Sequence, residues 1–300
     1  MSSESPSIIA LPVVFESLDH DIRTRPESPP LPTGIGALDD ATFGLHAGEI
    51  TIIGGRPGEG KTSLALFMAY TLAAKGKAIL FLSLEMTKEQ LLERLFCHVC
   101  DVDSWALRQG QKPEDYDSRA ATFKSMIASW KLHILDDFGY AFDELASIFT
   151  RYDVPPEVLI LDYIQLVQGV SGQEERETIN EYLKTLKRLA KRHHLAVVIL
   201  SQMNRGVHTT KKSRPSLHQF KSTGALEETG DCCLLLQYRT LDEEEGLTEW
   251  KPGQRPDDPK PEFHIIVAKQ RHGPIGRVVT NFHPTKFRFV DPPVTRWEAT

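Results

Sequence analysis

A pattern that binds phosphate occupies residues 55–62. It fits G-x-x-x-x-G-K-[ST], follows one apolar run and precedes another, which is the strand-to-helix context that this chemistry requires. Glycines let successive backbone N–H groups turn toward a phosphate, and the start of the next helix adds a positive dipole end. We expect ATP and Mg²⁺ as cofactors, with Lys61 on the β- and γ-phosphate oxygens and Thr62 on the metal. The expected nucleotide-binding residues are Gly55, Arg56, Pro57, Gly58, Glu59, Gly60, Lys61, Thr62 and Ser63.

A magnesium site also needs a carboxylate at the end of a strand, and the sequence offers two. Asp162 follows the wholly apolar run Val158–Leu161, whereas Asp136 follows the mixed run 132–135. A wholly apolar strand is typical of the centre of a parallel sheet that is covered on both faces. We therefore expect Asp162 to be the metal-associated carboxylate and Asp136 to serve in a turn or a helix cap.

Hydrolysis requires one group that activates water and another that senses the γ-phosphate. Glu85 stands just past the apolar run 79–84, and Gln202 stands just past the run 197–201. Side chains at the carboxyl ends of strands lie where open α/β sheets bind their ligands. We expect Glu85 to be the general base and Gln202 the sensor. The alternatives are an acid at a helix N-terminus and an ordinary surface amide.

A pair of cations marks the C-terminal part of the chain. Lys269 and Arg271 stand two residues apart in a strand-like run, so they share one face, and Gly273, Pro274 and Gly276 then turn the chain. Two cations at a hairpin tip suit the charge that develops on a phosphoryl group bound to a neighbouring subunit. An exposed basic hairpin without that role is the alternative.

Residues 205–221 contain five Lys or Arg residues and no acid, together with Gly206 and Pro215. A segment of this kind can follow the phosphate backbone of a single strand without reading its bases. A solvated basic loop is the alternative.

The elements that must position these residues alternate between strand and helix, which predicts an α/β fold. We expect a P-loop NTPase with a mostly parallel central sheet, helices on both faces and a C-terminal β-hairpin region. The predicted strands are 50–53, 78–82, 158–161, 196–200, 232–236 and 264–268. The predicted helices are 62–75, 88–102 and 178–193, and the acidic, Pro-rich segment 242–262 is expected to be an exposed excursion.

Two regions are expected along the chain. Residues 1–32 form an N-terminal arm, in which Val14, Leu18 and Ile22 recur at helical spacing before a cluster of prolines prevents continuation of the helix. Residues 33–300 form the ATPase domain.

Composition excludes several classes of protein. With a net charge of −6, 40% hydrophobic and 25% charged residues, the chain is neither disordered, collagenous nor a coiled coil. No apolar run reaches the ~18 residues of a membrane span, and no secretory signal is recognisable, so we expect a cytoplasmic protein without a membrane partner. Cys97-x-x-Cys100 lacks a second Cys/His pair for zinc, so buried free thiols are the preferred interpretation.

Several motifs, taken in order, resemble those of the C-terminal motor domain of the DnaB-type replicative helicases, which are hexameric rings with a RecA-like core. The resemblance spans roughly Leu31 to Val290 and includes the Arg56-Pro57 form of the phosphate loop. The other motifs are Pro32-Thr33-Gly34, Ser83-Leu84-Glu85-Met86, Asp162-Tyr163-Ile164-Gln165-Leu166, Ser201-Gln202-Met203-Asn204-Arg205, Thr223-Gly224-Ala225-Leu226-Glu227 and Ala268-Lys269-Gln270-Arg271-His272-Gly273-Pro274.

The resemblance implies roles for individual residues. Glu85 matches the catalytic glutamate of the family, Asp162 its magnesium-associated aspartate and Gln202 its γ-phosphate sensor. Lys269 and Arg271 match the pair that reaches the nucleotide of the adjacent subunit. The loop that holds single-stranded DNA in the centre of the ring corresponds to Lys221, Ser222 and Gly224.

The resemblance further implies an ATP-dependent DNA helicase motor that assembles as a ring, expected to be a hexamer. Such a ring moves along single-stranded DNA and unwinds duplex in DNA replication. The helix around residues 14–22 is similar to the linker helix that docks on the adjacent subunit. Residues 1–32 leave no room for the helical N-terminal domain of the family, so contacts with a primase or a replication loader are less expected than the motor chemistry.

Two other functions remain open at this point. A regulatory ring ATPase similar to RecA and KaiC would act on a protein partner and unwind nothing. A P-loop kinase for a small molecule would work as a monomer and would need neither Lys269 nor Arg271 from a neighbour.

Overall fold

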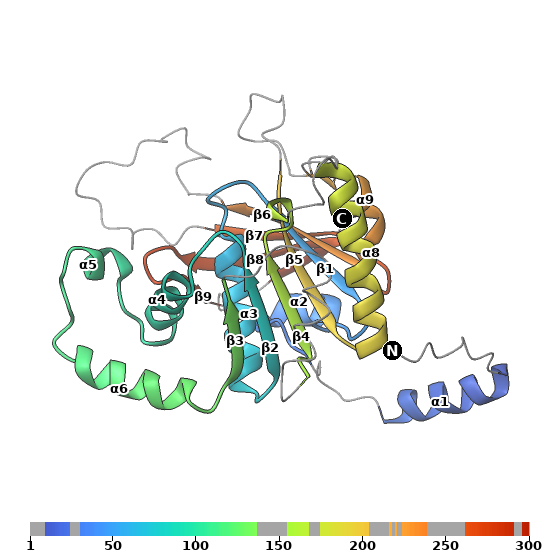
Figure 1. Cartoon of the computed structure of the whole chain (residues 1–300), viewed down its shortest axis with the longest axis horizontal. Helices are drawn as coiled ribbons and strands as arrows, with labels where there is room; N and C mark the ends of the chain where they lie inside the picture. Colours follow the sequence, from blue (N-terminus) through green and yellow to red (C-terminus); the bar gives the residue numbers. More distant parts are fainter. Residues whose placement is uncertain are drawn as a thin grey trace.

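The apolar runs of the sequence form the strands of one β-sheet, as the computed structural model in Figure 1 shows. The structure describes residues 10–24, 31–136, 155–167, 175–203, 216–217, 220, 224–238, 262–290 and 296–299. The expected mixed α/β class is confirmed, because parallel strands and helices alternate through most of the chain.

Six strands run parallel to one another, and the C-terminal strands run antiparallel beside them. The parallel strands are β1 (Ile50–Gly55), β2 (Ala78–Ser83), β3 (Lys131–Leu135), β4 (Val158–Asp162), β5 (Ala196–Gln202) and β6 (Cys232–Tyr238). The others are β7 (Glu262–Gln270), β8 (Gly276–His283), β9 (Arg288–Val290) and β10 (Arg296–Ala299). Their order is β10-β8-β7-β6-β1-β5-β4-β2-β3, with β9 paired to β8, so the strand that leads into the phosphate loop lies in the middle.

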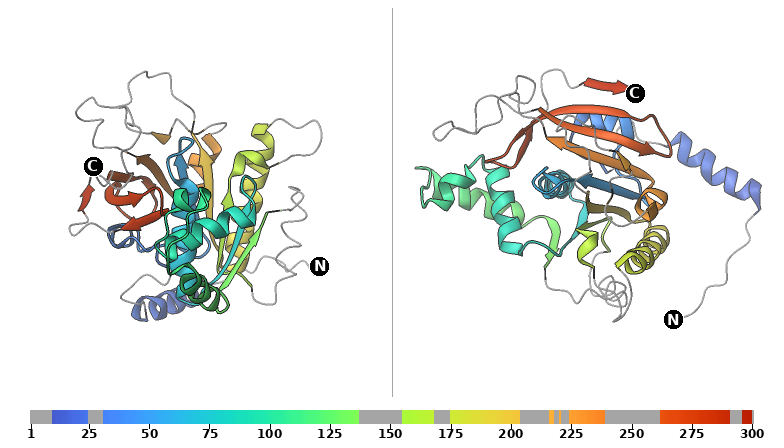
Figure 2. Two further views of the ribbon diagram at one scale, coloured as in Figure 1. Left: turned by 90° about the vertical axis from the view of Figure 1, so that its left-hand side faces the viewer. Right: turned by 90° about the horizontal axis from the view of Figure 1, so that it is seen from above.

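Helices cover both faces of this sheet, as the two views in Figure 2 show. Helices α3 and α4 pack on one face, and α8 and α9 pack on the other. The helices are α1 (Leu11–Arg23), α2 (Gly36–Thr42), α3 (Lys61–Ala74), α4 (Lys88–Val99), α5 (Ser104–Arg108), α6 (Tyr116–Ile127), α8 (Glu175–His193) and α9 (Gly224–Thr229), with the short 3₁₀ helix η1 (Ile164–Leu166) after β4.

The central strands explain the two-sided cover. Successive strand residues point to opposite faces, so Ile53 and Phe81 join the core beneath α3 while Ile52 and Leu80 join the core beneath α8. All four side chains are fully buried. Continuous apolar runs were expected for this reason, and burial of apolar area on both faces is the main force that holds the sheet and its helices together.

Several predicted boundaries were wrong by one to three residues; the helix expected over 178–193, for example, begins at Glu175. The helix expected over 88–102 ends at Val99, because Asp101 takes a left-handed φ of 55° and the N–H of Val102 returns to the carbonyl of Cys97. The excursion expected over 242–262 lies outside the described residues except for Glu262, which is the first residue of β7.

Helix α1 lies away from the sheet in Figure 1 and Figure 2. Val14, Leu18 and Ile22 fall on this helix with 47%, 47% and 54% of their surface exposed. The expected short helix is therefore present, while its docking on a second subunit and the division into an arm and an ATPase domain stay predictions. No helix in the described part of the chain is both long enough and apolar enough to cross a membrane.

Candidate nucleotide site

The phosphate loop joins the end of β1 to the start of α3. Gly58 and Gly60 have φ angles of 81° and 79°, a left-handed conformation that residues with a Cβ rarely adopt. The Nζ of Lys61 donates hydrogen bonds of 3.0 Å to the carbonyls of Gly55 and Arg56, so the lysine lies across the inside of the loop. The loop thus folds around the ammonium group that is expected to contact phosphate.

The carboxylate of Asp162 lies directly beside this loop. The hydroxyl of Thr62 donates a 2.7 Å hydrogen bond to Oδ2 of Asp162, although 100 residues separate the two in sequence. Asp162 is fully buried, and its Oδ1 has no hydrogen-bond partner among the described residues. A buried, unsatisfied carboxylate oxygen next to a hydroxyl fits Mg²⁺, a hard cation that takes oxygen ligands.

Burial dominates the electrostatics of this pair of charges. The pKa of Asp162 is raised to about 6, chiefly by desolvation and also by the charge of Glu85, while the hydrogen bond from Thr62 and the charge of Lys61 oppose the shift. Desolvation also lowers the pKa of Lys61, against the attraction of Asp162, Glu59 and Glu85. Charges beside the buried carboxylate of Asp162 therefore interact more strongly than they would in water.

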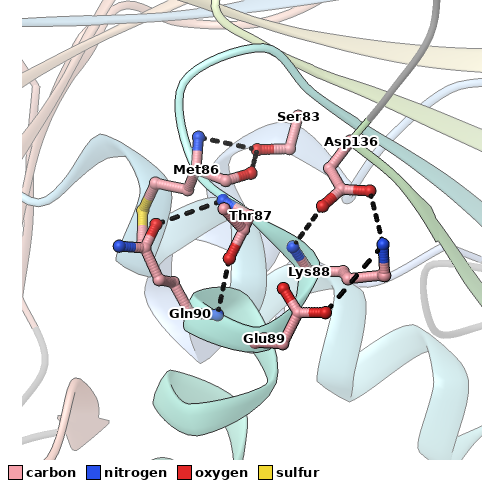
Figure 3. A network of polar contacts seen from close by, with 7 residues as sticks. All are labelled: Ser83, Met86, Thr87, Lys88, Glu89, Gln90 and Asp136. Atoms are coloured by element: carbon pink, nitrogen blue, oxygen red, sulfur yellow. Dashed lines mark hydrogen bonds and ion pairs between the residues drawn. The ribbon is translucent and has the colours of Figure 1, made fainter.

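Asp136, the other candidate for the metal, stabilises the start of α4. Its carboxylate accepts hydrogen bonds from the backbone N–H of Lys88 at 2.8 Å and from the side chain of Lys88 at 3.3 Å (Figure 3). Both contacts lower the pKa of Asp136. The expected alternative of a helix cap describes Asp136 well, because a carboxylate at a helix N-terminus satisfies a free N–H and the helix dipole.

Glu85 lies in the turn between β2 and α4. That turn is closed by Ser83 and Met86, and the first turn of α4 is capped by the reciprocal hydrogen bonds of Thr87 and Gln90 (Figure 3). Glu85 therefore precedes the cap and does not serve as an acid of the helix N-terminus. Its side chain is exposed, and its charge still raises the pKa of the buried Asp162.

Gln202 ends β5 beside the phosphate loop, where it is paired with Gly55 of β1. Its backbone is held by Gln165, a residue to which sequence reasoning assigned no role. The side chain of Gln165 accepts a hydrogen bond from the N–H of Gln202 at 3.1 Å and donates to the hydroxyl of Ser201 at 2.8 Å. The only sequence signal was the position of Gln165 three residues after Asp162.

Arg94 is a second residue that sequence reasoning missed. It lies on α4 with its guanidinium 4.9 Å from the ring centre of Phe287, and its Nε is buried without a hydrogen-bond partner among the described residues. Burial lowers the pKa of Arg94, and the charges of Asp162 and Glu85 oppose that shift. A buried cation near two site carboxylates can compensate their charge.

Lys269 and Arg271 lie at the opposite edge of the sheet from the phosphate loop. Gln270, between them, pairs with Cys232, which pairs with Thr51 near the start of β1. The phosphate loop follows the other end of β1, and a strand of this length spans roughly 16 Å. The hairpin β7–β8 is present, but its two cations are placed far from the Lys61 of their own chain.

Both cations contact residues near α9. The Nζ of Lys269 donates to the carbonyl of Glu227 and, at 3.4 Å, to that of Glu228, which are the C-terminal carbonyls of this short helix. Arg271 forms an ion pair of 3.2 Å with Asp231. Lys269 lies on β7 and Arg271 directly follows it, so their action on one nucleotide stays a prediction.

Of the three residues expected to bind DNA, Gly224 begins α9, while Lys221 and Ser222 lie outside the described residues, as does most of the basic segment 205–221. Phe220 is described and buried, and its backbone pairs with Met203 just past Gln202. The basic segment therefore has its C-terminal side anchored beside the nucleotide site.

Known proteins of related sequence are replicative DNA helicases. The chain is 29% identical over 296 residues to the replicative DNA helicase DnaB of Rickettsia prowazekii, covering 92% of this chain and 60% of that protein. It is 32% identical to DnaB of Leifsonia xyli, covering 87% of this chain and 56% of that protein. The chain therefore spans somewhat more than half the length of these curated relatives.

Solved structures show the same fold. A DnaB-like replicative helicase, studied with its interactions with primase, superposes with a TM-score of 0.81 at 23% identity, covering 94% of this chain and 68% of that chain. A second solved structure, of an ATPase domain, gives a TM-score of 0.82 at 22% identity, covering 95% of this chain and all of that domain. Residues 30–291 match the family described as the DnaB-like helicase C terminal domain. The chain therefore belongs to the DnaB-like helicase C-terminal domain family.

Proposed function

We propose that this chain is an ATP-hydrolysing motor that assembles into a ring, moves along single-stranded DNA and unwinds duplex during DNA replication. The observation that carries the proposal is the separation of one catalytic set across the sheet. Lys61, Thr62 and Asp162 lie at one edge, and Lys269 and Arg271 lie at the other. A pocket that needs all five groups can be completed only by a second copy of the chain.

The residues at the first edge have complementary tasks. Backbone N–H groups of the loop and the ammonium of Lys61 bind the phosphates, and Thr62 and Asp162 offer oxygen ligands. Mg²⁺, when bound there, supplies positive charge that offsets the charge developing on the transferred phosphoryl group. Glu85 takes the proton from the attacking water, and its exposure before nucleotide binds leaves it free to reach that water.

The residues at the second edge act on the nucleotide of the adjacent subunit. Arg271 and Lys269 stabilise the negative charge that spreads over the γ-phosphoryl oxygens, a task for which an arginine from a neighbour is often used. Gln202, held through Gln165 beside the phosphate loop, senses whether the γ-phosphate is present.

The strand that Gln202 ends leads directly into the basic segment 205–221. We propose that this segment, with Lys221, Ser222 and Gly224, binds phosphates of single-stranded DNA. Loss of the γ-phosphate would then shift this segment together with the DNA that it binds. This proposal implies a cytoplasmic protein. A primase or a loader is a further candidate partner, supported by a family member whose structure was studied with its interactions with primase.

The direct test is strand displacement on a forked substrate, with ATP hydrolysis measured alongside. Wild-type chain should unwind the fork, and single-stranded DNA should stimulate its hydrolysis in a salt-sensitive way. Lys61→Ala should abolish both activities. Arg271→Ala should bind nucleotide normally but lose DNA-stimulated turnover. A monomer that hydrolyses ATP at full rate without DNA would contradict the proposal.

The same experiment separates the rival functions. A regulatory ring ATPase would assemble and hydrolyse ATP but would show neither DNA stimulation nor strand displacement. A small-molecule kinase would sediment as a monomer with nucleotide bound, and Arg271→Ala would leave its activity intact.

A further inference from the structure

Asp231 is a buried carboxylate that joins three elements. Its side chain is 3% exposed and accepts hydrogen bonds from the backbone N–H of Ile50 at 2.8 Å and from the side chain of Lys187 on α8. Its other oxygen lies 3.2 Å from Nε of Arg271. A buried carboxylate is tolerated only when donors surround it, and here the donors come from β1, from α8 and from the residue that follows β7.

Arg271 is held by this single residue at two points. The backbone N–H of Arg271 donates to the carbonyl of Asp231 at 3.0 Å, and its Nε approaches the carboxylate of the same residue. The first contact fixes the backbone from which the side chain starts, and the second holds Nε beside Asp231. The two contacts restrain the direction of the side chain, although 49% of it is exposed.

The contact between the guanidinium and the carboxylate is made at Nε. Arginine has five N–H donors, and the four on Nη1 and Nη2 form the fork that binds a phosphate in bidentate fashion. In the described part of the chain Asp231 is the one carboxylate paired with Arg271, at 3.2 Å from Nε. Because this contact is made at Nε and 49% of the side chain is exposed, the arginine keeps donors for a phosphate.

We propose that Asp231 is a positioning residue, which aims the fork of Arg271 at the terminal phosphate of the nucleotide bound by the adjacent subunit. This inference rests on the proposed function of Arg271. The N–H of Ile50 holds the carboxylate in place and Lys187 balances its charge, so the aim of Arg271 is set by the start of the phosphate-loop strand. Because misplacing a stabilising group by ~1 Å can cost about 100-fold in rate, losing this contact should be almost as harmful as losing the arginine.

The first experiment compares two variants that disturb the same carboxylate. Asp231→Asn keeps the size of the side chain and can still accept from Ile50, but it loses the charge that holds Arg271. We expect kcat for DNA-stimulated hydrolysis to fall about 10- to 100-fold while KM for ATP changes little. Lys187→Met, the matched control, should lower Tm to a similar extent and keep kcat close to that of the wild type. Equal loss of kcat in both variants would mean that the effect is structural and would overturn the inference.

The Asp231→Asn variant can fail to fold, and a double variant then replaces it. Removing Asp231 alone leaves Lys187 partly buried without its partner, which is strongly destabilising, whereas removing both charges is often close to neutral. If Asp231→Asn does not fold, Asp231→Asn with Lys187→Met takes its place, and Lys187→Met alone remains the control.

The second experiment uses mixed rings, which report on the neighbour's site. Subunits carrying Lys61→Ala cannot hydrolyse their own ATP but still supply Arg271, so activity should fall in proportion to the fraction of such subunits. Subunits carrying Lys61→Ala with Asp231→Asn also fail their neighbour, so activity should fall as the square of the wild-type fraction. Lys61→Ala with Arg271→Ala serves as the reference for a lost arginine.

The outcomes distinguish the two levels of the argument. If activity falls as the square of the wild-type fraction both in the Arg271 reference mixture and in the Asp231 mixture, the inference holds. If activity falls as the square of the wild-type fraction in the Arg271 reference mixture, but only in proportion to that fraction in the Asp231 mixture, the inference is wrong and the proposed function stands. If activity falls only in proportion to the wild-type fraction in both mixtures, Arg271 does not act on the nucleotide of the adjacent subunit, and the inference is wrong as well.

Discussion

Thr62 Oγ1 lies 2.7 Å from Asp162 Oδ2, which ties the first turn of α3 to the end of β4 inside the sheet. The second oxygen of Asp162 is buried without a hydrogen bond from any described residue. Such an oxygen costs stability, since a buried polar group without a partner loses its hydration and gains nothing in return. The protein therefore keeps a destabilising feature where it would bind a metal, which is a common trade of stability for function.

Asp162→Asn should consequently stabilise the protein in the absence of nucleotide and metal while abolishing ATP hydrolysis. Burial raises the pKa of Asp162 from 3.8 to about 6, so the folded state binds this proton more tightly than the unfolded state. Wild-type stability therefore falls as the pH rises from about 4 to 6, and the loss is complete above that window. The gain from Asp162→Asn should be about 3 kcal/mol at pH 8 and should vanish near pH 4.

Denaturant titrations of wild type and variant at both pH values test this expectation. Other groups titrate in the same range, but the difference between the two proteins isolates Asp162. A stability difference that does not vary between pH 4 and pH 8 would contradict the assignment of a raised pKa to this carboxyl.

Loss of the Arg94 charge should shift the acidic limit of activity. Its positive charge lowers the pKa of Asp162, so removing the charge should raise that pKa and move the acidic limb of the kcat–pH profile to higher pH. Arg94→Met keeps a flexible stem against Phe287 and is the preferred variant. Arg108→Met is the control, because Arg108 is largely exposed and pairs with Glu93 at 3.6 Å. Profiles of the two variants that shift equally would remove Arg94 from the site.

Site residues whose position is fixed by the strand directly before them could be predicted from sequence. Each such residue follows a continuous apolar run, and a run of that kind is buried whichever strand lies beside it. Asp162 could be ranked above Asp136 for the same reason, since the strand before Asp162 is the more apolar of the two.

Residues that depend on the order of strands could not be predicted. Asp231 meets the N–H of Ile50 only because β6 lies beside β1, and 181 residues separate the two. Gln165 reaches Gln202 because β4 neighbours β5, and Arg94 reaches the site because α4 returns over the sheet. Local periodicity carries no information about which strands become neighbours, so contacts of this kind appear only in the folded chain.

Thr87→Ala should destabilise the protein by about 1 kcal/mol, the usual cost of losing an N-cap. Thr87 and Gln90 form a reciprocal capping box at the start of α4 (Figure 3), the helix that follows Glu85. Thr87→Ser keeps a hydroxyl for the cap and should retain most of the stability, so it is the matched control. Denaturant titration measures both variants, and equal losses would show that the methyl group rather than the cap is responsible.

Gly54 and Phe220 should be energetically coupled across the site. A Cβ added at Gly54 would lie 2.5 Å from Cε1 of Phe220, closer than real Cβ atoms come to other atoms, and 3.0 Å from Cδ2 of Leu235, which is a tight contact. Both neighbours are buried, so Gly54→Ala should cost roughly 1–3 kcal/mol through overpacking.

A smaller side chain at position 220 should relieve that clash. Phe220→Leu alone should be destabilising because it leaves space beside Gly54, but in the Gly54→Ala background it should restore part of the lost stability. A double-mutant cycle measured by denaturant unfolding therefore predicts a favourable interaction energy of about 1 kcal/mol or more. Strict additivity of the two changes would mean that Phe220 does not contact β1. The packing of Phe220 against the phosphate-loop strand, next to the basic segment, would then be absent.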